Sequence, residues 1–232
     1  SNTFTGLVIN QGQVTVGNAN ALPAASPVTL NGNGAILSFA TATPNASPLL
    51  VNADSTLNTS VATTYAGSIT LTNGANLVVF PIGSLAPSTL SGQISGDGGL
   101  IFATGNSGNG ISVIVSGASA NTYTGLTQIV GTAGSSGGGG CRISLEKTSG
   151  VAIAGDILLG SRYMVAGQTR MPSETLRLNG GANQDQIADT SVITFVGGST
   201  SDAGSFDLYG RSETIGAIQS QVRGDGVIEN GG

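Results

Sequence analysis

Short runs of alternating apolar and polar residues recur along the chain. Clear examples lie at residues 7–9, 14–16, 28–30, 68–71 and 111–115. Alternation of this kind predicts strands that each bury one face. No segment has the period of an amphipathic helix, and the chain is therefore predicted to be all-β.

Turn-forming sequences separate these runs. They are rich in Gly, Asn and Asp, which tolerate positive φ angles better than other residues do. Examples lie at residues 31–34, 73–74, 95–99 and 105–106. Short strands separated by frequent turns are typical of a β-sandwich or of a β-solenoid.

One phrase of the sequence occurs more than once. Residues 2–7 (NTFTGL) return as residues 121–126 (NTYTGL), and a weaker copy (TYAG) occupies residues 64–67. The aromatic residues of the three copies are 61 and 58 residues apart (4 to 65, and 65 to 123). Two nearly equal spacings predict a repeat of about sixty residues built from smaller coils, and such a repeat favours the solenoid.

The composition agrees with a folded β protein and divides the chain by charge. Only 8% of the 232 residues are charged, against roughly 25% in an ordinary domain, while 39% are hydrophobic. Before residue 141 the only charged side chains are Asp54 and Asp97. We expect a low-charge solenoid segment at 1–134, a Gly-rich loop at 135–140, and a solenoid segment at 141–232 that continues the first.

The same composition argues against several classes of partner. The net charge of −5 offers no basic surface for nucleic acid. No apolar run approaches the roughly 20 residues that span a bilayer. The chain begins with Ser and shows no signal peptide, so we expect a mature product or an excised piece of a longer protein.

Candidate catalytic chemistry is sparse. The chain has no His and one Cys, which excludes a Ser–His or Cys–His nucleophile and ordinary zinc sites. A glycoside hydrolase needs two carboxylates, and Asp185 with Asp189, or Asp207 with Glu213, are the candidate pairs. The competing interpretation makes these acids turn formers and solvated positions. We expect no enzyme, no catalytic residue, and no cofactor or metal ligand.

Other polar residues each have two interpretations. Asp97 and Asp225 lie in Gly-Asp-Gly sequences that could bind calcium, but without a tandem repeat they are better explained as turns. Cys141 precedes Arg142, which could lower the thiol pKa; a buried small residue at the start of a strand is the preferred interpretation. Residues 58–60 match a glycosylation sequon, which a bacterial origin would leave unused.

The remaining charged residues are expected to form ion pairs on the outer face. They belong to the second half of the chain, and exposed pairs contribute only about 0–1 kcal/mol each. The residues concerned are Lys147, Arg177, Arg211 and Glu213.

Three stretches of the second half resemble a known repeat. Residues 176–181 with 186–192, residues 206–218 (FDLYGRSETIGAI) and residues 224–228 together resemble the autotransporter-associated β-strand repeat. The phrase NTYTG at residues 121–125 is also similar to that family. The resemblance implies a right-handed parallel β-helix that is exported and displayed outside a bacterial cell.

Stacking of coils explains the residue types. Each coil lies about 4.8 Å from the next, so inward positions form apolar columns, and Asn and Thr can form hydrogen-bonded ladders at the bends. Alternation places Phe206 and Leu208 inward and Asp207 outward. Coils of roughly 20–25 residues would give about ten coils and a rod on the order of 50 Å long.

The function expected from this fold is structural or adhesive. Such a solenoid would act outside the cell as a fibre, filament subunit or matrix element, and its partners would be copies of itself, stacked end to end or laterally, and surface glycans. The alternative is a polysaccharide-binding or polysaccharide-degrading β-helix. A phage-type fibre, which would be a trimer, is a third interpretation.

Overall fold

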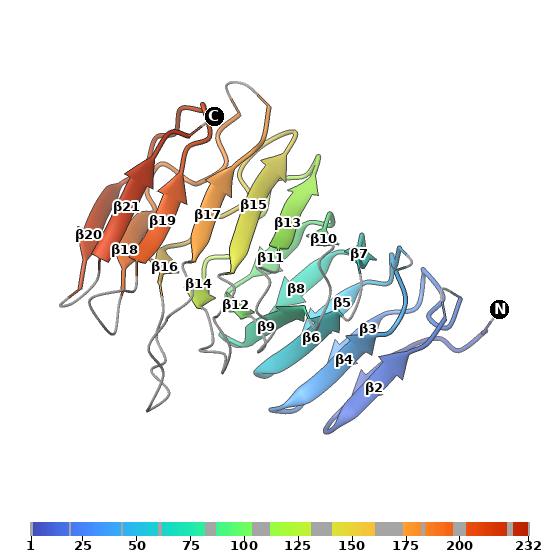
Figure 1. Ribbon diagram of the computed structural model, residues 1–232. Helices are drawn as coiled ribbons and strands as arrows, with labels where there is room; N and C mark the ends of the chain where they lie inside the picture. Colours follow the sequence, from blue (N-terminus) through green and yellow to red (C-terminus); the bar gives the residue numbers. More distant parts are fainter. Residues whose placement is uncertain are drawn as a thin grey trace, which may run out of the picture.

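The computed structural model has 21 strands, all in parallel sheets, and no helix among the residues that it describes. Figure 1 shows the strands stacked side by side from the N-terminal end to the C-terminal end. The predicted all-β parallel solenoid is therefore confirmed. The structure describes residues 2–18, 20–42, 44–59, 62–81, 87–103, 112–130, 141–160, 174–181, 184–196, 203–221 and 225–231.

Sheet A forms one side of the first half of the stack. Its strands have three residues each, of which the first and third are usually buried and the middle one is partly exposed. The alternation of apolar and polar residues in the sequence thus matches the alternation of buried and partly exposed side chains along these strands. Sheet A consists of β1 (Leu7–Ile9), β3 (Val28–Leu30), β5 (Leu49–Val51), β8 (Ile69–Leu71) and β11 (Ile94–Gly96).

Sheet B runs through nine successive layers and is the longest of the three sheets. One of its inward columns passes through Leu37, Leu57, Val79, Phe102 and Ile129, each paired with the next. The predicted columns of like residues are therefore present. Sheet B consists of β2 (Gln13–Val16), β4 (Ala35–Phe39), β6 (Ser55–Thr59), β9 (Asn76–Pro81), β12 (Gly99–Ala103), β14 (Thr127–Val130), β16 (Ile157–Leu159), β18 (Val192–Phe195) and β20 (Ala217–Ser220).

Sheet C has seven strands and begins later than the other two sheets. Its inward column contains Leu90, Val115, Leu145 and Leu178, which are almost fully buried. Sheet C consists of β7 (Thr64–Tyr65), β10 (Ser88–Leu90), β13 (Ser112–Gly117), β15 (Arg142–Lys147), β17 (Thr175–Leu178), β19 (Ala203–Asp207) and β21 (Asp225–Glu229).

The corner between sheets A and B carries a ladder of polar side chains. Asn31 donates its amide to Asn10 Oδ1 at 3.0 Å, and Asn52 donates to Asn31 Oδ1 at 3.1 Å. The Thr72 hydroxyl continues the ladder to Asn52 Oδ1 at 2.8 Å. The predicted ladders of Asn and Thr at the bends are thus observed, and they join four successive coils.

Coil length varies more than the sequence suggested. Ala35 pairs with Ser55, 20 residues later, whereas Ile157 pairs with Ile193, 36 residues later. Longer coils in the second half leave nine layers in sheet B, close to the predicted ten. At about 4.8 Å per layer the described stack is roughly 40 Å long, shorter than the expected 50 Å.

The sixty-residue repeat is not a structural unit. Tyr65 belongs to β7 of sheet C, whereas Tyr123 lies beside β11 of sheet A, because Thr122 and Thr124 donate to the carbonyls of Ile94 and Gly96. Two copies of the phrase therefore occupy different sides of the solenoid. The nearly even spacing of the aromatic residues predicted a period of about sixty residues, but the coils differ in length and do not repeat with that period.

Candidate functional site

The structure brings together a pair of carboxylates that the sequence did not pair. Glu213 lies beside Asp185, and the two side chains are hydrogen-bonded to each other. The Glu213 carboxylate also accepts the backbone N–H groups of Gln186 and Ile187 at 3.1–3.2 Å. The partner predicted for Asp185 was Asp189, so that pairing is replaced by a contact between neighbouring coils.

Burial is the main influence on the Glu213 carboxyl. Burial and the neighbouring Asp185 raise the pKa of Glu213, the two backbone N–H groups lower it, and the net result is a pKa of about 8. At neutral pH the Glu213 carboxyl is therefore mostly protonated. A shallow pocket lies over it, lined by Asp185, Ser212, Glu213 and Thr214.

This pair does not have the geometry of a glycoside hydrolase. Retaining enzymes hold their two carboxyl groups about 5–5.5 Å apart, and inverting enzymes hold them farther apart. A hydrogen bond between Glu213 and Asp185 holds the two acids closer together than either arrangement. Through its hydrogen bonds with the Gln186 and Ile187 N–H groups, the Glu213 side chain links its own coil to the preceding one.

Asp207, the other acid proposed to work with Glu213, has a different partner. Its side chain is 3% exposed and forms an ion pair with Arg177, at 2.8 Å between Oδ2 and Nε. The Arg177 guanidinium lies 4.4 Å from the centroid of the Tyr209 ring. Asp207 is therefore not a solvated position as expected, because Arg177 and Tyr209 cover it. Phe206 is buried as predicted, and Leu208 is partly buried against the core.

Lys147 lies inside the solenoid and not on its outer face. Its side chain is buried, and its amine donates to the Gly92 carbonyl at 3.4 Å. Burial lowers the pKa of Lys147 to about 8. The Gln186 side chain accepts from the Lys147 N–H and donates to its carbonyl, as a neighbouring strand would. The predicted outer ion pair is thus wrong for Lys147; within the described residues Arg211 forms none either.

Cys141 is buried directly before β15, as the preferred interpretation stated. Burial raises the pKa of its thiol, and the nearby Glu174 carboxylate raises it further. The idea that Arg142 lowers this pKa is therefore wrong. A buried thiol of raised pKa is a poor nucleophile.

The turn acids give no metal site in the described part of the chain. Asp97 accepts the Gly74 N–H at 3.1 Å and so joins two corners. No group of three acidic, Cys or His side chains comes together there. The Asp225 side chain, the loop predicted at 135–140 and Ser60 of the sequon lie outside the described residues, and Asn58 of the sequon is buried.

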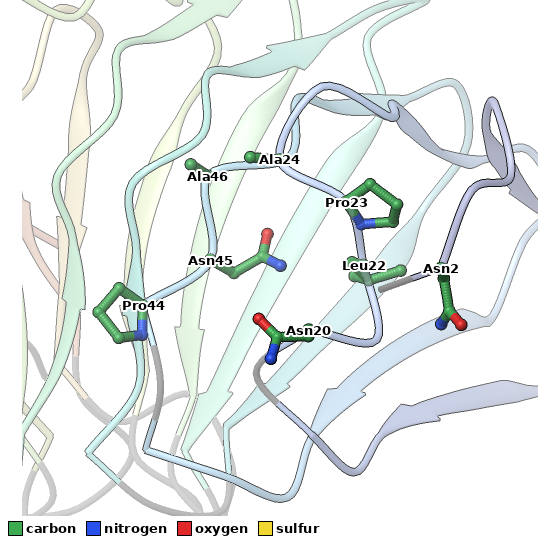
Figure 2. A pocket seen from close by; sticks show the side chains of 8 residues that line it. All are labelled: Asn2, Asn20, Leu22, Pro23, Ala24, Pro44, Asn45 and Ala46. Atoms are coloured by element: carbon green, nitrogen blue, oxygen red, sulfur yellow. The ribbon is translucent and has the colours of Figure 1, made fainter.

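One pocket was not predicted from the sequence. It lies beside the first three coils, where sheet C has not yet begun, and Figure 2 shows it from close by. Three asparagines and five apolar residues line it, and none of them is charged. They are Asn2, Asn20 and Asn45 with Leu22, Pro23, Ala24, Pro44 and Ala46.

The fold defines the chain as a parallel β-solenoid. No family model, no curated protein and no solved structure matches it. In the part of the chain that the structure describes, no helix is long and apolar enough to cross a membrane.

Proposed function

We propose that this chain is part of an extracellular structural or adhesive protein of bacteria, in which the solenoid itself is the working element. The observation that carries the proposal is the continuous parallel stack, with nine layers in one sheet. A rod of this kind spaces or displays other groups, and its strand edges can continue into further layers. The resemblance to autotransporter passengers supports a place on the cell surface.

The outer rows of the solenoid suit this role. The outward row of sheet A mixes apolar and hydroxyl side chains and carries no charge; it passes through Val8, Thr29, Leu50, Thr70 and Ser95. Like charges at this spacing would repel each other, whereas hydroxyl groups do not. An uncharged wall of this kind avoids that repulsion and can contact glycans or other copies of the rod.

Self-association is the proposed mode of assembly. Three apolar side chains of the last two strands, Ile218, Val227 and Ile228, are between 42% and 53% exposed. Further strands would cover them, whether these belong to a second copy stacked end to end or to more of the same protein. We infer that a second copy, or lateral contact between rods, completes the filament.

Electron microscopy of the purified chain over a range of concentrations tests this assembly. Filaments of uniform width that lengthen with concentration are expected, and Ile228→Lys should shorten them because it places a charge on the stacking face. Val8→Lys, in the outward row of sheet A beside Thr29, tests lateral contact between rods. Isolated rods roughly 40 Å long at every concentration would contradict self-association.

Immunogold labelling of intact source cells tests the location. Gold on the outer surface without permeabilisation is the expected result, and labelling only after lysis would contradict an extracellular role.

The alternative function, a polysaccharide-binding or polysaccharide-degrading β-helix, is supported only in its binding form. The neutral pocket beside the first three coils favours binding, while the direct Asp185–Glu213 contact opposes hydrolysis. Incubation with a panel of polysaccharides and measurement of new reducing ends separates the two. Turnover that disappears in Glu213→Gln would establish the degrading enzyme instead.

A further inference from the structure

The pocket beside the first three coils has an ordered set of hydrogen-bonding groups. Asn45 is 4% exposed, and its Oδ1 accepts the Ser47 N–H at 3.0 Å. This contact fixes the amide and leaves its Nδ2 group as a donor. In Figure 2 the Asn45 side chain points into the space between Asn20 and Leu22.

The facing rim supplies complementary groups. Asn2 donates its Nδ2 to the Ala21 carbonyl at 2.8 Å, which leaves its Oδ1 as an acceptor. The Asn20 side chain is exposed at the rim and can act as donor and acceptor. The three amides come from three successive coils, so the folded solenoid sets their spacing.

Apolar surface lies between these amides. Leu22 is 6% exposed and forms part of the lining, together with Pro23 and Pro44. None of the residues that line the pocket is charged. A charged ligand would lose water here without gaining an opposite charge, which is unfavourable.

We propose that this pocket binds one neutral sugar residue of a glycan. The hydroxyl groups of such a residue both donate and accept hydrogen bonds, as the amides of Asn20 and Asn45 do, and its C–H face can pack on Leu22 and the prolines. The pocket volume of about 270 Å³ lies just below the range for sites that bind drug-sized molecules, roughly 300–1,000 Å³. It therefore holds a single ring.

The site is independent of the proposed structural role. A rod can form filaments without binding sugar, and a sugar site can exist on a rod that stays single. In combination, the two would give a fibre that carries one glycan-binding pocket on each copy of the chain. Sugar binding and filament formation are measured separately, so either can fail alone.

Saturation-transfer NMR on the whole chain tests the proposal. The probes are the methyl glycosides of glucose, galactose, mannose and N-acetylglucosamine, with glucuronic acid as the charged comparison. At least one neutral glycoside should show transfer, and it should shift the side-chain amide signals of Asn20 and Asn45. Absence of transfer from all neutral probes at tens of millimolar, or stronger transfer from glucuronic acid, would overturn the proposal.

Three variants locate the site. Asn20→Ala removes an exposed amide, and Asn45→Asp keeps the acceptor for the Ser47 N–H while removing the donor. Each should weaken binding roughly fivefold, the effect of losing one neutral hydrogen bond. Asn33→Ala, at an exposed position of the corner between sheets A and B, is the matched control and should bind as the parent does. Equal affinity in all four proteins would place the sugar elsewhere and refute the site.

The natural source of the sugar is distinguished by a second comparison. Free monosaccharide, methyl glycoside and the corresponding polysaccharide are measured against the parent and Asn20→Ala. Tighter binding of the polymer identifies a glycan chain, whereas equal binding of all three identifies a free sugar and would limit the proposal to the monosaccharide.

Discussion

Single glycines determine whether neighbouring coils can approach each other at the corners. A Cβ atom on Gly125 would lie 2.2 Å from the Gly98 carbonyl oxygen, and one on Gly155 would lie 2.3 Å from that of Gly125. These three residues occupy the same corner in successive coils, between the sheet A side and sheet B. Gly125 of the NTYTG phrase is thus required by the close contact of backbones and not by flexibility, whereas a Cβ on Gly6 of the first copy would lie 3.5 Å from the Pro27 carbonyl oxygen.

Substitution of this glycine should be costly. Gly125→Ala forces the coils apart, and we expect a loss of about 2–4 kcal/mol in the free energy of unfolding. Gly17→Ala is the control, because a Cβ there would meet nothing within 4 Å; it should change stability by less than about 1 kcal/mol. Urea unfolding followed by circular dichroism measures both, and equal effects would contradict the contact.

The ion pair between Arg177 and Asp207 is a second feature that depends on single residues. Arg177→Met removes the cation and leaves a carboxylate that is almost fully buried. Because the Arg177 side chain is itself 27% exposed, water can partly replace it, and we expect a loss of about 2 kcal/mol. Arg142→Met, on an exposed position of β15, should be nearly neutral in the same urea experiment. If Arg177→Met leaves the free energy of unfolding unchanged, the ion pair contributes no stability.

At the level of elements, the Glu213 carboxyl makes attachment of its coil depend on pH. Its pKa is about 8 in the folded chain against 4.5 as the ordinary value. Between these pH values the folded state binds more protons than the unfolded state, so stability is greatest below pH 4.5 and falls as pH rises to 8. The Glu213 side chain is partly exposed, so solvent screens the interaction, and we therefore expect an effect of about 1 kcal/mol.

Glu213→Gln tests this dependence. The amide keeps an oxygen for the Gln186 and Ile187 N–H groups and carries no charge. The melting temperature of the variant should therefore change less between pH 5 and pH 8 than that of the parent. The variant should be more stable than the parent at pH 8 and similar to it at pH 4. An unchanged slope in Glu213→Gln would assign the pH dependence to another group.

The strands could be predicted from the sequence, but their partners could not. Alternation located β1, β3 and β8, and the Asn-Gly signal at residues 73–74 marks a corner where both residues have positive φ angles. Pairing depends on how many residues each coil contains, and side loops change that number without altering the strands. For this reason the sequence paired Asp185 with Asp189, four residues away, and missed Glu213 on the next coil.

The pocket with three asparagines was missed for the same reason. Asn2, Asn20 and Asn45 have no motif in common, and they meet only because the first coils have nearly equal lengths. Buried Lys147 shows a second limit of sequence patterns. A Lys is expected on the surface, but here the space along the axis admits its chain as far as the Gly92 carbonyl. The position of the three asparagines and the burial of Lys147 both depend on the three-dimensional arrangement of the coils and not on the local sequence pattern.

For the whole molecule, the fold implies that a coil is a removable unit. In a solenoid each layer contacts mainly its two neighbours, so stability is approximately a sum over layers and their interfaces. Asn10, Asn31 and Asn52 occupy equivalent places on the corner ladder, with 21 residues from one to the next. Removing residues 31–51 would join Leu30 to Asn52 in the way that Val51 is joined to it now.

The shortened chain should fold as the same solenoid with one layer fewer. Asn52 would take the place of Asn31 opposite Asn10, and β6 would stack on β2, with an expected cost of about 1–3 kcal/mol for lost packing. Circular dichroism should retain its β signal, and small-angle scattering should show a particle about 5 Å shorter. The control removes only residues 31–40, which deletes β4 and its corner but keeps β5, so sheets A and B lose their common register. That control should lose cooperative unfolding; if both deletions behave alike, stacking by equivalent coils does not govern this fold.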